Sequence, residues 1–162
     1  MRSSIVFVIG LLMGSAIATA LAQGNARLDT SGVNHVAMSV DNFDEALAFY
    51  TQKMGFREVL NMHTDQGQPT LAFVQASRDT FIEIAPANAN RPVGLTHFGL
   101  LVSDINGTVA ALKERGVTVS DPRSVGEQWS VANITAPSGI RIELTQLGPQ
   151  SVPMKASANW AR

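Results

Sequence analysis

Apolar and polar residues alternate with the two-residue period of a β-strand in two segments of the chain, 33–40 and 95–102. In each segment, one strand face is strongly apolar, and the other carries a histidine beside small residues, which leaves room for a ligand. The apolar faces consist of Val36, Met38 and Val40 in the first segment and Phe98, Leu100 and Val102 in the second. An Asp-containing turn and a segment with apolar residues at helical spacing follow each strand.

These two segments belong to an internal repeat. VNHVAMSVDNFDEALAFY (33–50) aligns with LTHFGLLVSDINGTVAAL (95–112), and TFIEI (80–84) aligns with IRIEL (140–144). His35 and His97 are 62 residues apart, and Glu83 and Glu143 are 60 residues apart. Two matched pairs at nearly one offset indicate a duplicated unit of about 60 residues.

Each unit is expected to fold as a strand, a helix and three further strands. Asn42 and Glu45 form a capping box at the start of the first helix, and Gly55 and Gly116 suit the position after each helix. We predict strands at 56–63, 69–77 and 79–85 in the first unit and at 117–120, 127–135 and 140–147 in the second. The tail, 148–162, contains Pro149 and Pro153 and is expected to leave the sheet, with a short segment around Trp160.

Composition narrows the possible functions. The chain has 162 residues, of which 45% are apolar and 15% are charged, and this balance is typical of one globular domain. A net charge of −1 gives no reason to expect a nucleic-acid partner. Cysteine is absent, so a metal ion would have to bind histidine and carboxylate side chains.

The N-terminus has the features of an export signal. Arg2 precedes an apolar run, and Ala20-Leu21-Ala22 resembles a cleavage site. We expect residues 1–22 to be a signal peptide, 23–32 a flexible lead-in, and the mature protein to be periplasmic or secreted, without membrane contact after cleavage. The alternative is an uncleaved anchor, because the run from Ile5 to Ala22 is just long enough to span a bilayer.

Four strand residues are candidates for a metal site: His35, Glu83, His97 and Glu143. Each lies on the strand face opposite to apolar residues, where a buried carboxylate needs a partner. A single such histidine could equally be a hydrogen-bonded strand residue, and each glutamate could be solvated or paired, Arg141 being near Glu143. The two histidines occupy equivalent positions of the repeat, as do the two glutamates, and this coincidence favours a metal site over four unrelated polar residues. His63 has no counterpart and is expected at the surface.

The chain resembles the vicinal-oxygen-chelate superfamily (glyoxalase, bleomycin-resistance and dioxygenase proteins) over residues 33–147. NHVAMSVDNFDEALAFYTQKMGFREV and APSGIRIEL carry the resemblance. It implies an α+β fold in which two tandem βαβββ modules, about 33–87 and 94–147, form a half-open cup around one metal ion. It also implies metal ligands at His35, Glu83, His97 and Glu143, and a homodimer in which each cup is completed across the interface.

The resemblance to glyoxalase I implies a lyase or isomerase that acts on a small α-hydroxy carbonyl or related oxygen-chelating substrate through an enediolate. A divalent ion (Ni, Zn, Mn or Fe(II)) would act as the Lewis acid. Glu143 is the first candidate for the base, with Glu83 opposite it. Glutathione-using members have Arg, Asn and Asp where this chain has Ser39, Ala87 and Ala136, which argues against glutathione.

Three alternatives remain open. An epimerase of the methylmalonyl-CoA kind shares the cup and the proton abstraction. An extradiol-type Fe(II) dioxygenase needs two histidines and one glutamate, so Glu83 would be surplus. A non-catalytic protein that sequesters a small molecule belongs to a different class, and the retained ligand quartet argues against it.

Overall fold

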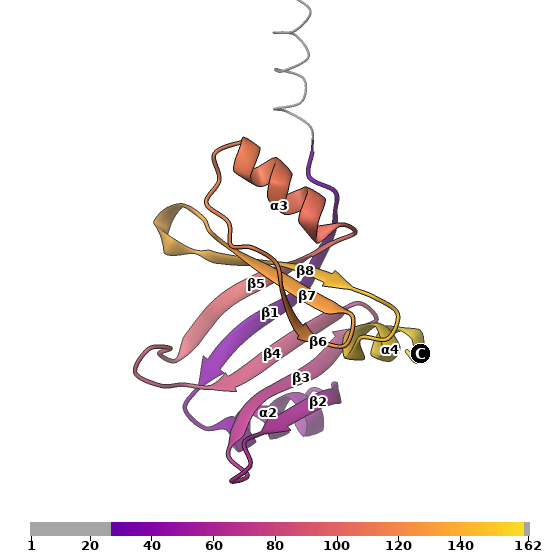
Figure 1. The fold of residues 1–162 in the computed structure, drawn as a ribbon. Coiled ribbons are helices and arrows are strands. Elements are labelled where there is room, and N and C mark those ends of the chain that lie inside the picture. Colours follow the sequence, from indigo (N-terminus) through magenta and orange to yellow (C-terminus); the bar gives the residue numbers. More distant parts are fainter. Residues whose placement is uncertain (1–26, 161–162) are drawn as a thin grey trace, which may run out of the picture.

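The computed structural model describes residues 27–160, which form one eight-stranded sheet with the strand order β2-β3-β4-β1-β5-β8-β7-β6 (Figure 1). The strands are β1 (Thr30–Val40), β2 (Arg57–His63), β3 (Pro69–Ser77), β4 (Thr80–Pro86), β5 (Gly94–Val102), β6 (Arg123–Gly126), β7 (Trp129–Thr135) and β8 (Arg141–Leu147). The helical segments are α2 (Phe43–Ala48), which continues as the π-helical turn η1 (Phe49–Lys53), α3 (Ile105–Glu114), the 3₁₀ turn η2 (Pro137–Gly139) and α4 (Val152–Ala158).

The sheet order confirms the duplication. β1 pairs in parallel with β4, and β5 pairs in parallel with β8, so the two units have the same internal order. The first strands of the two units, β1 and β5, pair antiparallel at the centre of the sheet. The result is the predicted α+β fold, two tandem βαβββ modules that form one half-open cup.

The helices cover the apolar face of each module. Phe43 of α2 packs in a cluster with buried Val74 and Ile84, and Met38, Val40 and Ile82 lie against it. In the second module, Ile105, Val109 and Leu112 of α3 pack with Val102 and Leu144, as their helical spacing predicts. Burial of each large aliphatic side chain contributes about 1.5–3 kcal/mol. These clusters fix which strand face is turned toward the helices, and therefore which face is left for chemistry.

The helix ends follow the sequence signals. The Asn42 side chain accepts a hydrogen bond from the Glu45 amide (3.2 Å) and donates one to the Glu45 carboxylate (3.1 Å). Gly55 and Gly116 adopt φ angles of 74° and 76°, the left-handed conformation that glycine accepts most readily after a helix. Met54, the residue that follows the π-helical turn η1, is half exposed.

Two strand predictions in the second module need correction. Residues 117–120 do not form a strand of the sheet; Val119 makes only an isolated bridge to Ile134, and its buried side chain packs with the α3 cluster. Pro122 has no N–H to donate, and strand pairing begins after it, at Arg123. The predicted strand 127–135 begins at Trp129, because the chain turns between β6 and β7 with Gln128 at φ 50°.

The tail leaves the sheet, as predicted, and forms α4. Arg57 on β2 holds this helix by donating to the carbonyl oxygens of Ala156 (2.8 Å) and Asn159 (3.4 Å). Residues 1–22, predicted to be a signal peptide, lie outside the described residues, as do residues 23–26 of the predicted lead-in 23–32. The last three residues of that lead-in are not a flexible segment, because β1 already begins at Thr30. Between residues 27 and 160, no helix has the length and apolarity needed to cross a membrane.

Candidate functional site

The four predicted ligand residues meet on the concave face of the sheet. They lie on four adjacent strands, with Glu83 on β4, His35 on β1, His97 on β5 and Glu143 on β8. All four belong to one chain, so no residue of a second subunit is needed to bring them together.

Two small residues make room for this convergence. Ala37 is in register with both Glu83 and His97, and Gly99 is in register with both His35 and Glu143. A Cβ atom on Gly99 would lie 2.1 Å from the His35 ring, so only glycine fits there while the ring keeps its place. The small residues noted beside each histidine therefore have a specific structural role.

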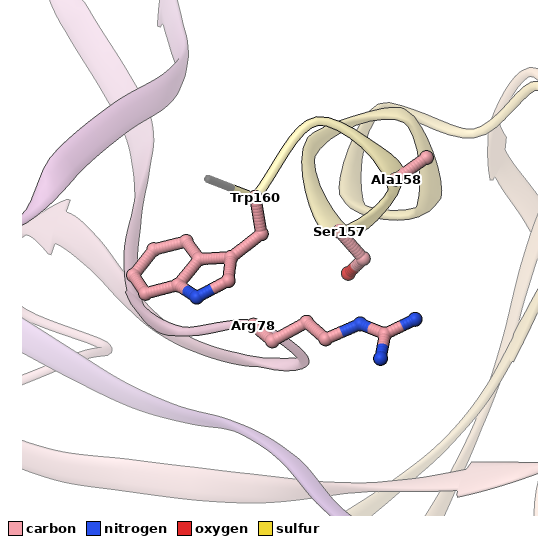
Figure 2. A pocket seen from close by; sticks show the side chains of 4 residues that line it. All are labelled: Arg78, Ser157, Ala158 and Trp160. Atoms are coloured by element: carbon pink, nitrogen blue, oxygen red, sulfur yellow. The ribbon is translucent and has the colours of Figure 1, made fainter. Parts of the chain in front are cut away.

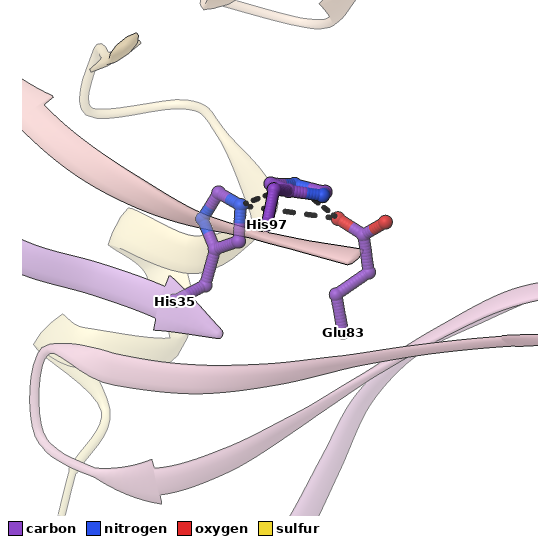
Figure 3. A group of neighbouring side chains, drawn as sticks. All are labelled: His35, Glu83 and His97. Atoms are coloured by element: carbon purple, nitrogen blue, oxygen red, sulfur yellow. Dashed lines mark hydrogen bonds and ion pairs between the residues drawn. The ribbon is translucent and has the colours of Figure 1, made fainter. Parts of the chain in front are cut away.

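His35, Glu83 and His97 form a compact group in which one donor atom of each lies within 4.8 Å of the others (Figure 3). The two Nε2 atoms are 3.1 Å apart. Glu83 Oε2 lies 4.0 Å from Nε2 of His35 and 3.9 Å from Nε2 of His97. Metal ligands with bonds of about 2.0–2.2 Å lie roughly 3–4 Å from one another around a common ion, so this spacing suits a metal site.

Glu143 lies beside the group of three. Its Oε1 atom is 3.6 Å from His35 Nε2 and accepts a long hydrogen bond (3.5 Å) from the Thr145 hydroxyl. It is a buried residue with 8% of its surface exposed. Glu143 therefore faces the same centre, but it is not part of the group whose donors all lie within 4.8 Å of each other.

Neighbouring polar groups orient both histidines. The backbone of β1 is irregular between Val33 and His35, and this places the Asn34 side chain next to the His35 ring. Asn34 Oδ1 lies 3.2 Å from His35 Nδ1, and Asn34 Nδ2 donates to the Asp79 carbonyl (3.3 Å). A proton on Nδ1 leaves the Nε2 lone pair free to face the centre.

On the other side, Nδ1 of His97 is in contact with the Arg141 guanidinium and lies 3.1 Å from the Thr96 hydroxyl. The salt bridge considered for Arg141 is thus not made with Glu143; its guanidinium is turned toward His97 instead. A guanidinium can only donate, so in this arrangement Nδ1 of His97 accepts from Arg141 and the ring proton is on Nε2. For Nε2 to act as a ligand, Nδ1 would carry the proton and donate a hydrogen bond to the Thr96 hydroxyl, with the guanidinium turned away.

Burial sets the charge state of all four residues. It lowers the pKa of His35 to about 4 and that of His97 to about 3, and the positive charge of Arg141 lowers both further. Burial, with the nearby Glu143 carboxylate, raises the pKa of Glu83 to about 7. Burial also raises the pKa of Glu143. At neutral pH the site therefore offers two neutral imidazoles and two carboxyl groups that ionise less readily than usual.

The group lies at the base of a cavity of about 430 Å³. Glu83, His97 and Glu143 line it together with apolar side chains of β2, β3, β6 and β7, including Leu60, Met62, Leu71, Phe73, Val125 and Trp129. A cavity of this size, in which an apolar wall faces a set of converging polar and charged groups, suits a small-molecule site. Phe73 packs against both His35 and Trp129, at ring distances of 5.6 Å and 5.2 Å, which keeps this side of the group dry.

Three arginines also line this cavity, and the sequence analysis did not identify them as a group. They are Arg91 between β4 and β5, Arg123 at the start of β6 and Arg141 at the start of β8. Only Arg141 carries a sequence signal, because it shares a strand face with Glu143. Arg91 is in a loop, and Arg123 begins the strand that was not predicted.

Ser39 and Ala87, which stand where glutathione-using members have Arg and Asn, both donate hydrogen bonds to backbone carbonyl groups. The buried Ser39 hydroxyl donates to the Pro92 carbonyl, and the Ala87 amide donates to the Val40 carbonyl (2.8 Å). Neither residue lines the 430 Å³ cavity. His63 is exposed at the end of β2, as predicted.

A smaller hollow of about 250 Å³ lies beside α4, between Arg78, Ser157, Ala158 and Trp160 (Figure 2). Figure 2 shows Arg78 and the Trp160 indole facing the same opening. The four lining residues include no carboxylate or imidazole. The chemistry of the molecule is therefore concentrated at the 430 Å³ cavity.

Solved structures confirm the fold. Methylmalonyl-CoA epimerase from Mycobacterium tuberculosis aligns with 77% of this chain and 93% of its own, at a TM-score of 0.65 and 22% identity. A second methylmalonyl-CoA epimerase aligns with 76% of this chain and 99% of its own, at a TM-score of 0.62 and 27% identity. A hypothetical protein from Bacillus halodurans aligns with 74% of this chain and 96% of its own, at a TM-score of 0.60 and 21% identity.

Sequence comparison gives the family. A chloroplastic protein of Arabidopsis thaliana, described as a probable lactoylglutathione lyase, is 29% identical over 129 residues. The match covers 74% of this chain but only 37% of the plant protein, so the chain spans little more than a third of that relative. Residues 32–144 match the profile of a whole superfamily. The chain belongs to the Glyoxalase/Bleomycin resistance protein/Dioxygenase superfamily.

Proposed function

We propose that this protein is a metal-dependent lyase or isomerase that removes a proton from the carbon next to a carbonyl group in a small substrate with oxygens on neighbouring carbons. One observation carries the proposal. Two neutral imidazoles and two carboxyl groups from four strands converge at the base of one cavity. The similarity to a probable lactoylglutathione lyase supports the same class of reaction.

The four side chains fit a divalent ion. Glu83 is only 16% exposed at its side chain, and neither it nor Glu143 forms an ion pair within 4.0 Å with a described lysine or arginine. Such carboxylates are costly to bury unless a cation joins them. Two imidazole nitrogens and carboxylate oxygens suit Ni, Zn, Mn or Fe(II). When bound, the ion supplies Lewis-acid stabilisation of the charge that develops on the substrate oxygens.

The geometry gives the two glutamates different roles. Glu83 approaches both histidines, so it belongs with them as a holder of the ion. Both glutamates line the cavity, but Glu143 approaches only His35, so it is the freer of the two to take a proton from a substrate carbon. Burial raises the pKa of Glu143, as it does that of Glu83, so the role of base is assigned from the geometry and not from the pKa.

Metal analysis and proton exchange test the proposal on the unaltered protein. We expect about one divalent ion per chain and, with a simple α-hydroxyketone, exchange of the proton next to the carbonyl for deuterium, followed by NMR. Protein that binds both metal and ketone without exchange would rule out the lyase or isomerase. Oxygen consumption with catechols and Fe(II) would then favour a dioxygenase, and inactivity in both assays a binding protein.

An epimerase is the second candidate, because two of the solved structures with this fold are methylmalonyl-CoA epimerases. Both reactions begin with removal of a proton next to a carbonyl, so Glu83 and Glu143 would have the same roles. The products of the reaction distinguish the epimerase from the glyoxalase-type lyase or isomerase. Deuterium incorporation with inversion of configuration at a 2-methyl thioester would favour the epimerase.

We predict that Gly99→Ala weakens metal binding by about tenfold to hundredfold, the range seen when the surroundings of a ligand are disturbed. The new methyl group would displace the His35 ring, which is completely buried and has little space to move. Overpacking should also lower the free energy of unfolding by about 1–3 kcal/mol. Isothermal titration with metal and thermal unfolding measure the two effects.

Gly126→Ala is the matched control, because a Cβ atom on this strand glycine would approach no atom closer than 3.6 Å. Both measurements should stay near the wild-type values in the control. Wild-type metal affinity in Gly99→Ala would contradict the position given to His35.

We also predict that metal affinity rises with pH and levels off above about pH 7. The raised pKa of Glu83, about 7, means that this carboxyl group holds a proton below neutrality and must lose it to bind an ion. Affinity should therefore increase at least about tenfold between pH 5.5 and 7. The histidines, with pKa values of about 4 and 3, compete little for protons in this range.

Titrations in buffers of different ionisation enthalpy count the protons released. Glu83→Gln is the control, since its affinity, though lower, should depend less on pH. Affinity that is constant from pH 5.5 to 7 would contradict the assignment of Glu83 as a ligand.

A further inference from the structure

Three guanidinium groups converge on the cavity that holds the candidate metal centre. Arg91, Arg123 and Arg141 come from a loop and two strands that are far apart in the sequence. The chain has only 12 lysines and arginines and a net charge of −1, so this concentration does not reflect a generally basic protein. A local excess of positive charge in a cleft attracts anions.

Most of the donors on these arginines are uncommitted. Arg123 makes no hydrogen bond or ion pair with any residue in the range 27–160. Arg91 donates from Nη2 to the Pro86 carbonyl (2.7 Å), but its Nε is buried without a partner. Arg141 contacts His97 through one nitrogen. A buried donor without a partner is costly, so Arg91 Nε is suited to a ligand that brings its own acceptor. Arg123 and Arg141 are exposed residues, and their guanidinium groups can turn toward the same ligand.

The net charge of the cavity also favours an anionic ligand. Three guanidinium groups face the two carboxyl groups of Glu83 and Glu143, which leaves at least one positive charge before any metal is counted. A divalent ion would raise this excess to three when both carboxyl groups are ionised. Apolar side chains such as Leu60, Val125 and Trp129 form the rest of the wall. The complementary ligand therefore has an anionic group, an apolar body and a compact size.

We infer that the substrate is a small organic acid, whose carboxylate is bound by Arg91, Arg123 and Arg141 while its neighbouring oxygens face the two histidines and two glutamates. This inference rests on the proposed function, since it places the substrate at the same centre. Guanidinium groups bind carboxylates through paired, charge-assisted hydrogen bonds, which gives both affinity and orientation. Arg91, Arg123 and Arg141 would thus bind the anionic group of the substrate. Ser39 and Ala87, which stand where glutathione-using members have Arg and Asn, would not bind a glutathione adduct.

The test compares two probes that differ only in the anionic group. Hydroxylevulinate is an α-hydroxyketone with a distal carboxylate, and its primary amide is the neutral counterpart. Calorimetric titration of Zn-loaded protein should show that the acid binds at least about tenfold more tightly than the amide. Arg123→Gln should weaken binding of the acid by about tenfold and leave that of the amide within twofold.

Arg123 is chosen because it is exposed and makes no hydrogen bond or ion pair with the four candidate ligands, so its replacement should leave folding unchanged. Its charge acts on the Glu143 carboxyl group, so both probes are titrated against variant protein whose metal content has been measured. Arg91→Gln is the second variant and should act in the same direction. Arg78→Gln, in the turn between β3 and β4, is the control and should bind both probes as the wild type does, because Arg78 does not line the cavity.

Equal affinity for the two probes, including no measurable binding of either, would overturn the inference. So would a preference for the acid that survives both Arg91→Gln and Arg123→Gln. The metal content of the same samples is measured separately. A protein that contains the ion and exchanges the ketone proton, but does not prefer the acid, would refute the acid subsite and leave the proposed function intact. A protein without metal or exchange would refute the proposed function instead.

Discussion

Replacing His97 with alanine should weaken divalent metal binding more than a hundredfold and remove turnover with it. His97 supplies one of two imidazole nitrogens in the group of three, and the two Nε2 atoms are 3.1 Å apart. Replacing a residue that hydrogen-bonds to a metal ligand typically weakens metal affinity tenfold to hundredfold, so replacing the ligand itself should weaken it more. Metal content after dialysis and a calorimetric titration would measure the change.

His63→Ala is the matched control. It makes the same substitution at the third histidine of the chain, which is exposed at the end of β2 and far from the centre in the strand order. We expect wild-type metal content and turnover in this control. His97→Ala protein that folds and still contains the wild-type amount of metal would exclude the proposed centre.

The convergence of the four candidate ligands could be predicted from the sequence because it depends on local rules. The alternation of apolar and polar residues decides which face of a strand each side chain occupies, and the repeat places His35 and His97, and Glu83 and Glu143, at equivalent positions. The observed parallel pairs β1 with β4 and β5 with β8 put each glutamate on the strand beside that of its histidine, and the pairing of β1 with β5 brings the two modules' residues together. Glu83 then lies near both histidines and Glu143 near His35. Sequence alone did not show that Glu143 lies apart from the group of three.

The arginines of the cavity could not be predicted in the same way. Arg91 and Arg123 lie outside the strands that the sequence analysis identified, and their convergence depends on how a loop and an edge strand fold back over the cup. The residues of β6 are all exposed and show no alternation, so they gave no strand signal. Val117 and Val119 gave a false signal, because they pack against α3 and not in the sheet ladder.

The four candidate ligands and the three cavity arginines are placed by different parts of the fold, and this difference has a consequence for specificity. Residues of the regular strands set the metal centre, which the two modules supply symmetrically. The arginines proposed to contact the substrate differ between the modules, since Arg123 on the edge strand β6 and Arg141 on β8 belong to the second module and Arg91 to the connection. A chain can therefore keep the proton chemistry of its superfamily while its substrate changes.

Glu143→Gln should separate the binding of metal from the removal of a proton. Glutamine retains a carbonyl oxygen that can accept the Thr145 hydrogen bond and nearly the same volume, but it cannot take up a proton at neutral pH. Because His35, Glu83 and His97 remain, we expect the variant to fold and to keep much of its metal. Proton exchange should fall by about 10²–10⁴-fold, the usual loss for a missing general base.

Glu114→Gln, an exposed substitution at the end of α3, is the control and should exchange protons at the wild-type rate. Glu83→Gln should have the opposite effect. If Glu83 mainly holds the ion, this variant should bind metal more weakly, and its exchange rate should fall only because less metal is bound. At saturating metal, Glu83→Gln should recover a larger share of its exchange rate than Glu143→Gln. If saturating metal restores Glu143→Gln and not Glu83→Gln, the two roles are reversed and Glu83 is the base.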